Sequence, residues 1–104
     1  MGNATGFRIT GGKGFHITFA NGWTVSVQFG PGNYCDNYDQ RIGRDEVKCA
    51  KAGSSNAECA VWGPDGKMVD RFDGSNVSNR SKPAEVLELM NWAAAQREND
   101  HRVE

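Results

Sequence analysis

Two short stretches of alternating apolar and polar residues, joined by an Asn-Gly pair, constrain the fold more than any other feature. In residues 15–19 every second side chain is large and apolar, and residues 23–29 repeat the pattern. Because successive side chains of a strand point to opposite faces, this alternation predicts two strands that each have one apolar face. Their short connection predicts a β-hairpin.

The length of the hairpin loop follows from the requirement that apolar residues share one face. A two-residue loop would place Phe19 opposite Thr24 and leave both faces half apolar. A three-residue loop at 20–22 avoids this and gives the pairs Phe19–Trp23, Ile17–Val25 and Phe15–Val27. We therefore predict a type I turn with a bulge, in which Gly22 takes the left-handed conformation that strains residues with a Cβ.

A second hairpin is predicted around Gly-Pro-Asp-Gly of residues 63–66, whose order of residues suits a turn that ends on a left-handed Gly66. Its strands are expected at 57–62 and 67–72. This register gives the pairs Val61–Val69 and Trp62–Met68. Because charged residues occur in the hairpin, we expect it to form the edge of the sheet; they are Glu58, Asp70 and Arg71.

The C-terminal third predicts a loop followed by a helix. Residues 73–80 are expected to form the loop, Ser81 to cap the helix, and the helix to cover about residues 83–96. Its apolar stripe should face the sheet, with Leu89 and Trp92 on the flank; the stripe comprises Val86, Leu87, Met90, Ala93 and Ala94. With a further strand at 7–10, the predicted fold class is α+β, a small antiparallel sheet of two hairpins plus an N-terminal strand, packed by one C-terminal helix.

Composition limits the function classes. The chain has 104 residues, the length of one domain, and a formal net charge of −1. Near-neutral charge argues against direct DNA binding, and 38% hydrophobic residues without a long apolar run argue against a membrane span. Three cysteines, no Cys-x-x-Cys and no leader sequence predict a cytosolic chain with reduced thiols and no metal site. We expect a single domain over residues 1–104, with 1–6 and 97–104 frayed.

The connection between the hairpins, residues 30–46, carries the best candidates for ligand binding. Long ordered loops in compact domains are often functional, and this one combines stacking, hydrogen-bonding and cationic side chains. Tyrosines can stack on planar rings, amides and carboxylates can bind base or ribose edges, and arginines can hold phosphate. The candidate ligand-binding residues are Asn33, Tyr34, Asp36, Asn37, Tyr38, Arg41 and Arg44. The alternative is an exposed loop whose tyrosines pack on the rim of the core.

Catalytic candidates are weaker. His16 lies on the polar face of its strand and can be imagined as a general base, although a surface histidine is the simpler interpretation. Cys35 is a conceivable nucleophile, although cysteines more often pack as small apolar residues. Gly-Gly-Lys-Gly at 11–14 lacks the spacing of a phosphate-binding loop. No set of residues forms a catalytic constellation, so we expect a protein that is not an enzyme and needs no cofactor.

Three segments resemble small hypothetical proteins of bacteriophages and prophages: GFHITFANGWTVSVQFG at 14–30, GNYCDN at 32–37 and ECAVWGP at 58–64. The resemblance covers most of the chain but carries no activity motif. It implies a counter-defence role, either as a sponge for nucleotide immune signals, as in Thoeris anti-defence proteins, or as an anti-CRISPR-like mask of a protein surface. For a sponge it further implies a compact homo-oligomer.

The leading hypothesis is a phage counter-defence protein in the host cytoplasm that sequesters a nucleotide-derived signal without cleaving it. The ligand would be a cyclic nucleotide or an ADP-ribose derivative. A homo-oligomer, dimer or higher, is expected also because one helix covers a sheet face only partly. The alternatives are a protein–protein inhibitor of a host defence complex, a small phosphodiesterase-type enzyme using His16, and a structural phage protein without a ligand.

Overall fold

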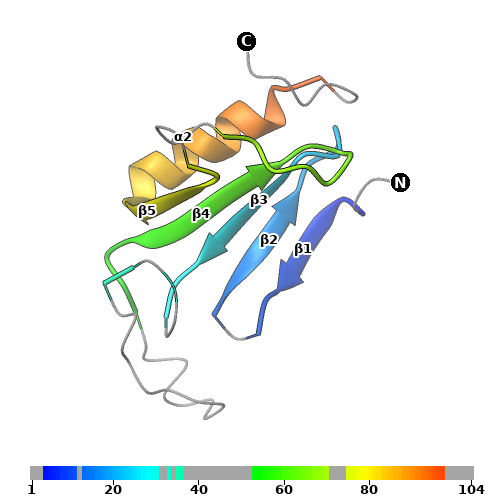
Figure 1. Ribbon diagram of the computed structural model, residues 1–104. Coiled ribbons are helices and arrows are strands. Elements are labelled where there is room, and N and C mark those ends of the chain that lie inside the picture. The colour runs from blue at the N-terminus through cyan, green and yellow to red at the C-terminus, as the bar shows by residue number, and fades with distance from the viewer. Residues whose placement is uncertain are drawn as a thin grey trace.

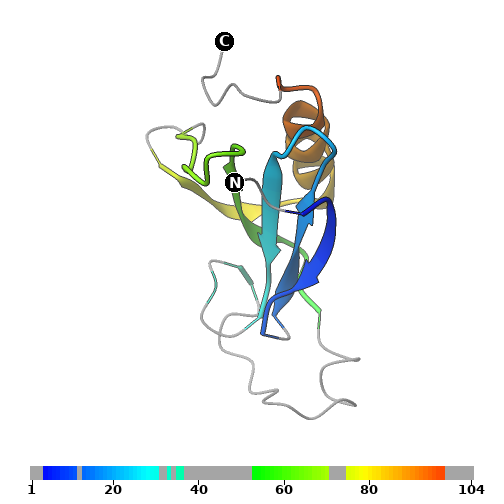
Figure 2. The ribbon, with the colours of Figure 1, turned by 90° about the vertical axis from the view of Figure 1, so that its right-hand side faces the viewer.

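The computed structural model describes residues 4–11, 13–30, 33, 35–36, 53–70 and 75–97. These residues form an antiparallel sheet and one helix (Figure 1). The elements are β1 (Gly6–Ile9), β2 (Gly14–Thr18), β3 (Thr24–Gln28), β4 (Ala57–Trp62), β5 (Val77–Ser81) and α2 (Pro83–Ala94). The five strands lie in chain order, so β1 and β5 are the opposite edges of the sheet (Figure 2). The predicted α+β fold class is confirmed.

The first hairpin has the predicted register. Phe15 pairs with Val27 and Ile17 with Val25, and the Phe19 amide donates to the Trp23 carbonyl over 2.9 Å. Gly22 has a φ of +86°, as the three-residue loop requires. The turn also packs against the turn of residues 63–66, because a Cβ on Gly22 would lie 3.1 Å from the Pro64 Cγ.

The second hairpin is only partly as predicted. Gly66 has a φ of +81°, Trp62 bridges to Met68, and the Val69 amide donates to the Val61 carbonyl over 2.9 Å. Beyond this point β5 occupies the outer edge of β4 instead, with Ala60 opposite Val77. The predicted edge position was therefore wrong, because β4 lies between β3 and β5. Residues 71–74 lie outside the described part of the chain.

The structure also corrects the expected loop at 73–80, because residues 77–81 form β5. Its sequence Val-Ser-Asn-Arg-Ser has no apolar alternation, and side-chain hydrogen bonds hold it instead. The Ser78 hydroxyl accepts the Cys59 amide at 3.0 Å and lies 2.6 Å from the Ser81 hydroxyl. Ser81 is thus the last strand residue, and Lys82 is the N-cap of the helix, where its amide donates to the Glu85 carboxylate over 2.9 Å.

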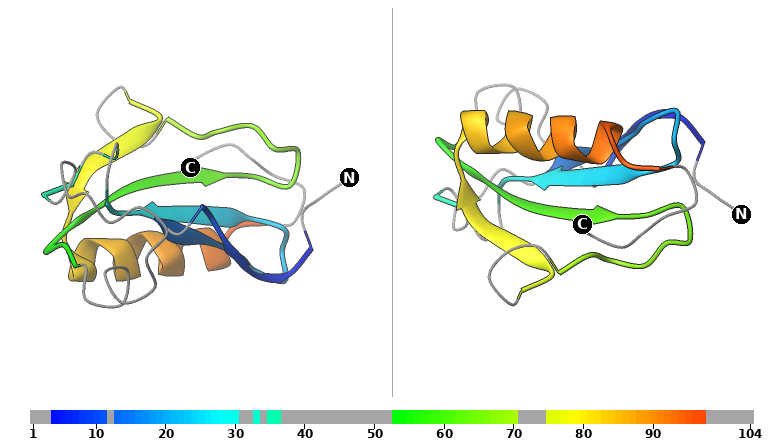
Figure 3. Two further views of the ribbon diagram at one scale, coloured as in Figure 1. Left: turned by 90° about the horizontal axis from the view of Figure 1, so that it is seen from below. Right: turned by 90° about the horizontal axis from the view of Figure 1, so that it is seen from above.

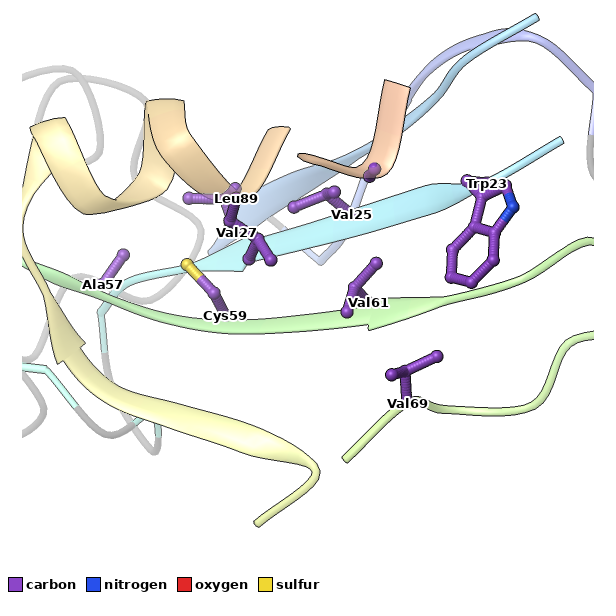
Figure 4. Close-up of a cluster of buried hydrophobic side chains, with 9 residues drawn as sticks. Trp23, Val25, Val27, Ala57, Cys59, Val61, Val69 and Leu89 are labelled. Carbon is purple, nitrogen blue, oxygen red and sulfur yellow. The ribbon is translucent and has the colours of Figure 1, made fainter. Parts of the chain in front are cut away.

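The helix presents only part of the predicted stripe to the sheet, since Ala93 is buried in the core and Val86 and Met90 pack against it. Leu89 and Ala93 are buried in the core, whereas Leu87 is 57% exposed and Ala94 is exposed. Leu89 points from α2 toward Val27 of β3 (Figure 4). The stripe is rotated because Trp92, expected on the flank, packs edge-on against the buried Trp23 with ring centroids 5.5 Å apart.

The core lies between α2 and one face of the sheet, and β5 curves away on the other side (Figure 3). Its buried residues come mainly from β3, β4 and α2; they are Trp23, Val25, Val27, Ala57, Cys59, Val61, Val69, Leu89 and Ala93. On β1, Phe7 and Ile9 pair with Ile17 and Phe15 and therefore share the helix side of the sheet. They are nevertheless 81% and 82% exposed, because α2 packs on β3 and β4.

Candidate functional site

A pocket of about 340 Å³ opens between the first turn of α2 and strands β2 and β3. We call it the helix–sheet pocket. Its floor is apolar and consists of Phe15, Val27, Phe29, Pro83 and Val86. Its rim is polar and includes Ser54, Ser55, Asn56 and Ser81. A hydrophobic floor with a few hydrogen-bonding groups at the rim is the usual composition of a small-molecule site.

The elements around the pocket hold its floor in place. Phe15 and Val27 are opposite each other on β2 and β3, so their side chains share the helix side of the sheet. Phe29 follows β3, and its amide donates to the Lys13 carbonyl over 2.7 Å. Pro83 suits the first helical turn, because its ring fixes φ and its missing N–H has no partner to lose there.

A polar cluster around Asp36 adjoins the rim. The Arg80 Nε and the Ser55 hydroxyl each donate to the Asp36 carboxylate over 2.9 Å, and the Asp36 amide donates to the Asn56 side chain over 2.9 Å. Arg80 reaches it from β5 with a φ of 52°, unusual for a residue with a Cβ. The hydrogen bond from Ser55, followed by that from Arg80, lowers the pKa of Asp36 below its ordinary value, so the carboxylate is ionised at neutral pH.

The structure describes two of the predicted binding residues. Asp36 lies beside the rim residues Ser55 and Asn56. Asn33 is half-buried, and its side-chain amide donates to the Gly30 carbonyl at 3.5 Å. The other five lie outside the described residues: Tyr34, Asn37, Tyr38, Arg41 and Arg44.

Two of the cysteines are structural. Cys35 and Cys59 are buried and not disulfide-bonded, and Cys49 lies outside the described residues. The Cys35 sulfur accepts the Gly30 amide at 3.2 Å, which fixes the chain after Phe29. Burial raises the pKa of the Cys59 thiol. Because neither sulfur is accessible, the interpretation of both as small apolar residues holds, and the alternative of Cys35 as a nucleophile does not fit.

Sequence reasoning missed the rim. Residues 53–56, Gly-Ser-Ser-Asn, precede β4 and contribute most of the polar lining. Their only signal was a short run of small polar residues between the long connection and an apolar strand. Such runs are common in turns of every kind, so they predict a loop without predicting a ligand.

The chain matches no protein-family profile, no curated protein and no solved structure. The described residues contain no cluster of three His, Cys, Asp or Glu side chains that could hold a metal ion. Within the same residues, α2 is too short and too polar to cross a bilayer. The residues and the geometry of the helix–sheet pocket are therefore what indicates a function.

Proposed function

We propose that this protein binds a nucleotide-type small molecule in the helix–sheet pocket and holds it without cleaving it. The observation that carries the proposal is the pocket itself, about 340 Å³ with an aromatic and aliphatic floor and a hydroxyl- and amide-bearing rim. Sites for small ligands fall at roughly 300–1,000 Å³. The pocket also adjoins Asp36, which belongs to the segment that the sequence singles out for ligand binding.

The base and the phosphate of a nucleotide would contact different residues of the protein. A planar base fits an apolar floor that includes Phe15 and Phe29, and its polar edge can bond to Ser55 and Asn56 at the rim. Arginines of the 30–46 segment, Arg41 and Arg44, are the proposed phosphate ligands, and Tyr34 and Tyr38 the proposed stacking residues. We include Asn33 and Asn37 in the proposal as further polar contacts.

The biological role follows the resemblance to small phage and prophage proteins. A domain that binds a nucleotide, and whose sequence indicates no catalytic constellation, would act by sequestration, as a counter-defence sponge in the host cytoplasm. The ligand class in this proposal is a cyclic nucleotide or an ADP-ribose derivative.

We also propose that the protein self-associates through β1. This strand is an edge of the sheet, and its Phe7 and Ile9 side chains are more than 80% exposed on the side of the core. The Thr10 amide donates to the Gly14 carbonyl, so the backbone groups of Thr10 point toward β2. In the first hairpin the Phe19 amide donates to the Trp23 carbonyl, which fixes the same alternation along β2. Since antiparallel pairing alternates, the backbone groups of Phe7 and Ile9 point away from β2. A partner strand on this edge would bond to the backbone and cover the side chains of the same two residues.

The charges on β1 are compatible with a second copy of the chain as the partner strand. In an antiparallel β1–β1 pair centred on Phe7, Phe7 meets the partner's Phe7 and Arg8 meets the partner's Gly6, so no like charges stand opposite each other. A register centred on Arg8 would oppose two guanidinium groups. One centred on Ile9 would draw in Gly11, which has a φ of +57° and belongs to the turn after β1.

The test of ligand binding is thermal unfolding against cyclic dinucleotides, cyclic trinucleotides and cyclic ADP-ribose isomers. A ligand at 100 times its Kd adds about 2.7 kcal/mol, which raises Tm on the order of 10 °C in a domain of this size. Val86→Phe should remove the shift, because the larger side chain fills the pocket floor. Leu87→Phe, on the exposed side of the same helical turn, is the matched control and should keep it.

Recovery of intact ligand after incubation separates a sponge from an enzyme, since turnover would contradict sequestration. A panel without any shift would overturn the nucleotide proposal and favour the protein–protein inhibitor, for which a defined host defence complex would be the next binding partner tested.

A further inference from the structure

A second, smaller pocket of about 180 Å³ lies on the face of the sheet opposite the helix. Two rows of side chains cross the strands there. Thr18 pairs with Thr24, which pairs with Trp62 in the next strand, and in the adjacent row Arg8 pairs with His16. Residues 4–6 also line the space. We call this the sheet-face pocket.

The wall of the sheet-face pocket is polar and ordered. The Thr18 and Thr24 hydroxyls lie 2.8 Å apart, and these residues are only 7% and 1% exposed. The His16 ring packs edge-on against the Trp62 indole, with centroids 4.9 Å apart and planes at 83°. Because both contacts are made across strands of the sheet, the polar groups are held in place before any ligand arrives.

Two side chains of the pocket carry nitrogen donors that have no acceptor among the described residues. Among the described residues, no carboxylate forms an ion pair with Arg8, and no residue hydrogen-bonds to a ring nitrogen of His16. Glu58 shares this face but stands opposite Gln28, one row away from His16. Burial, followed by the charge of Arg8, lowers the pKa of His16, so its ring is neutral at pH 7. A guanidinium and an imidazole beside two hydroxyls are the groups that bind an oxyanion.

We propose that the sheet-face pocket binds a phosphate group, with Arg8 and His16 as its ligands and the Thr18–Thr24 pair as its polar wall. The guanidinium offers paired N–H donors to two phosphate oxygens, and the imidazole offers one more. A bound anion favours the charged form of a neighbouring histidine, so His16 takes up a proton as phosphate binds. This site is separate from the helix–sheet pocket and does not depend on the function proposed for it.

The experiment is an NMR titration of the full chain with inorganic phosphate at constant ionic strength, following the imidazole Cε1 protons. The chain has two histidines, so His101 provides a second reporter, and His16→Gln assigns the signals. We expect a saturable shift of the His16 signal, a rise in its pKa when phosphate is present, and no saturable shift of His101. Arg8→Gln should weaken binding at least tenfold. Lys13→Gln, which removes an exposed cation near the same hairpin, should leave it unchanged.

A parallel titration with AMP distinguishes the two sources of a phosphate group. Equal response to AMP and phosphate assigns the site to the group on any carrier, and a response to phosphate alone assigns it to the free ion. The proposal is overturned if both histidines shift linearly without saturation, or if Arg8→Gln binds as the wild type does. Val86→Phe should not affect this titration. A failure of the nucleotide proposal at the helix–sheet pocket can therefore be told apart from a failure of the phosphate proposal at the sheet-face pocket.

Discussion

Gly14, at the start of β2, shows how a single side-chain atom can be incompatible with the sheet. It has a φ of +150°, and a Cβ there would overlap the carbonyl oxygen of Val27 on β3. Gly66 has a φ of +81° with open space around it, and Gly53 has neither a positive φ nor a close neighbour. Gly14 therefore represents a clash with the backbone, Gly66 represents backbone strain alone, and Gly53 represents no constraint.

Alanine at these three glycines should give graded losses of stability. We expect about 1 kcal/mol or somewhat more at Gly66 from backbone strain, and a larger loss at Gly14, where β2 and β3 must separate. Gly53→Ala should leave the free energy of unfolding within about 0.5 kcal/mol of wild type. Urea denaturation of the three variants measures the order. Equal losses at Gly14 and Gly66 would show that the strands separate at little cost.

His16 gives the protein an acid-sensitive contact. Its pKa in the folded chain is below 6.5, because burial and the charge of Arg8 disfavour the imidazolium. The unfolded chain therefore binds more protons between the folded pKa and 6.5, and stability is lost as pH falls through that window. His16→Gln should flatten this part of the curve. Thermal unfolding between pH 7.5 and 5 without phosphate measures it, and identical curves for both proteins would contradict the assignment.

Two leucines of α2 can be used to test which side of the helix faces the core. Leu89 is 5% exposed and Leu87 is 57% exposed, although they are only two residues apart. Leu89→Ala should cost about 2–4 kcal/mol, because it opens a cavity against β3, whereas Leu87→Ala should cost less than about 1 kcal/mol. Chemical denaturation of both variants measures the difference. A larger loss at Leu87 would mean that Leu87, as the sequence predicted, and not Leu89 faces the core.

The elements also show where sequence reasoning succeeds. The turns at Gly22 and Gly66 were predictable, because a left-handed glycine and the parity of the flanking strands leave one consistent register. The strand β5 was not, because its edge position is held by serine hydroxyls such as Ser78 rather than by an apolar face. The helix stripe was predicted only in part, because the Trp23–Trp92 contact depends on where α2 crosses the sheet, which periodicity alone does not contain.

At the level of the whole molecule, both pockets join residues that are distant in sequence. Asp36 was predictable as a polar residue of a long connection, but its contacts with Ser55 and Arg80 depend on how β4 and β5 are ordered. The sheet-face pocket likewise needs the order β1-β2-β3-β4 to bring Arg8 and His16 beside Trp62. Composition could indicate which residue types suit ligand binding, whereas strand order decides which of them meet.

The same strand order leaves β1 as an open edge, and cross-linking can test the dimer proposed there. In a β1–β1 pair centred on Phe7, this residue lies opposite its copy as a hydrogen-bonded pair, with Cα atoms about 5.5 Å apart. That distance suits a disulfide. Phe7→Cys, in a Cys49→Ser background, should therefore give a covalent dimer under mild oxidation, whereas Ile9→Cys should not, because Ile9 faces the partner's Thr5.

Sedimentation velocity tests the same dimer without a covalent cross-link. The wild type should sediment as a dimer and Phe7→Glu as a folded monomer, since Phe7 is 81% exposed and contributes little to the core. Leu87→Glu places the same charge on an exposed apolar site of α2 and should remain dimeric. A wild type that stays monomeric at high micromolar concentration would refute self-association. A dimer that cross-links through residue 9 and not residue 7 would overturn the register centred on Phe7, because the centre of the pair would then be Ile9 and every pairing would shift by four residues.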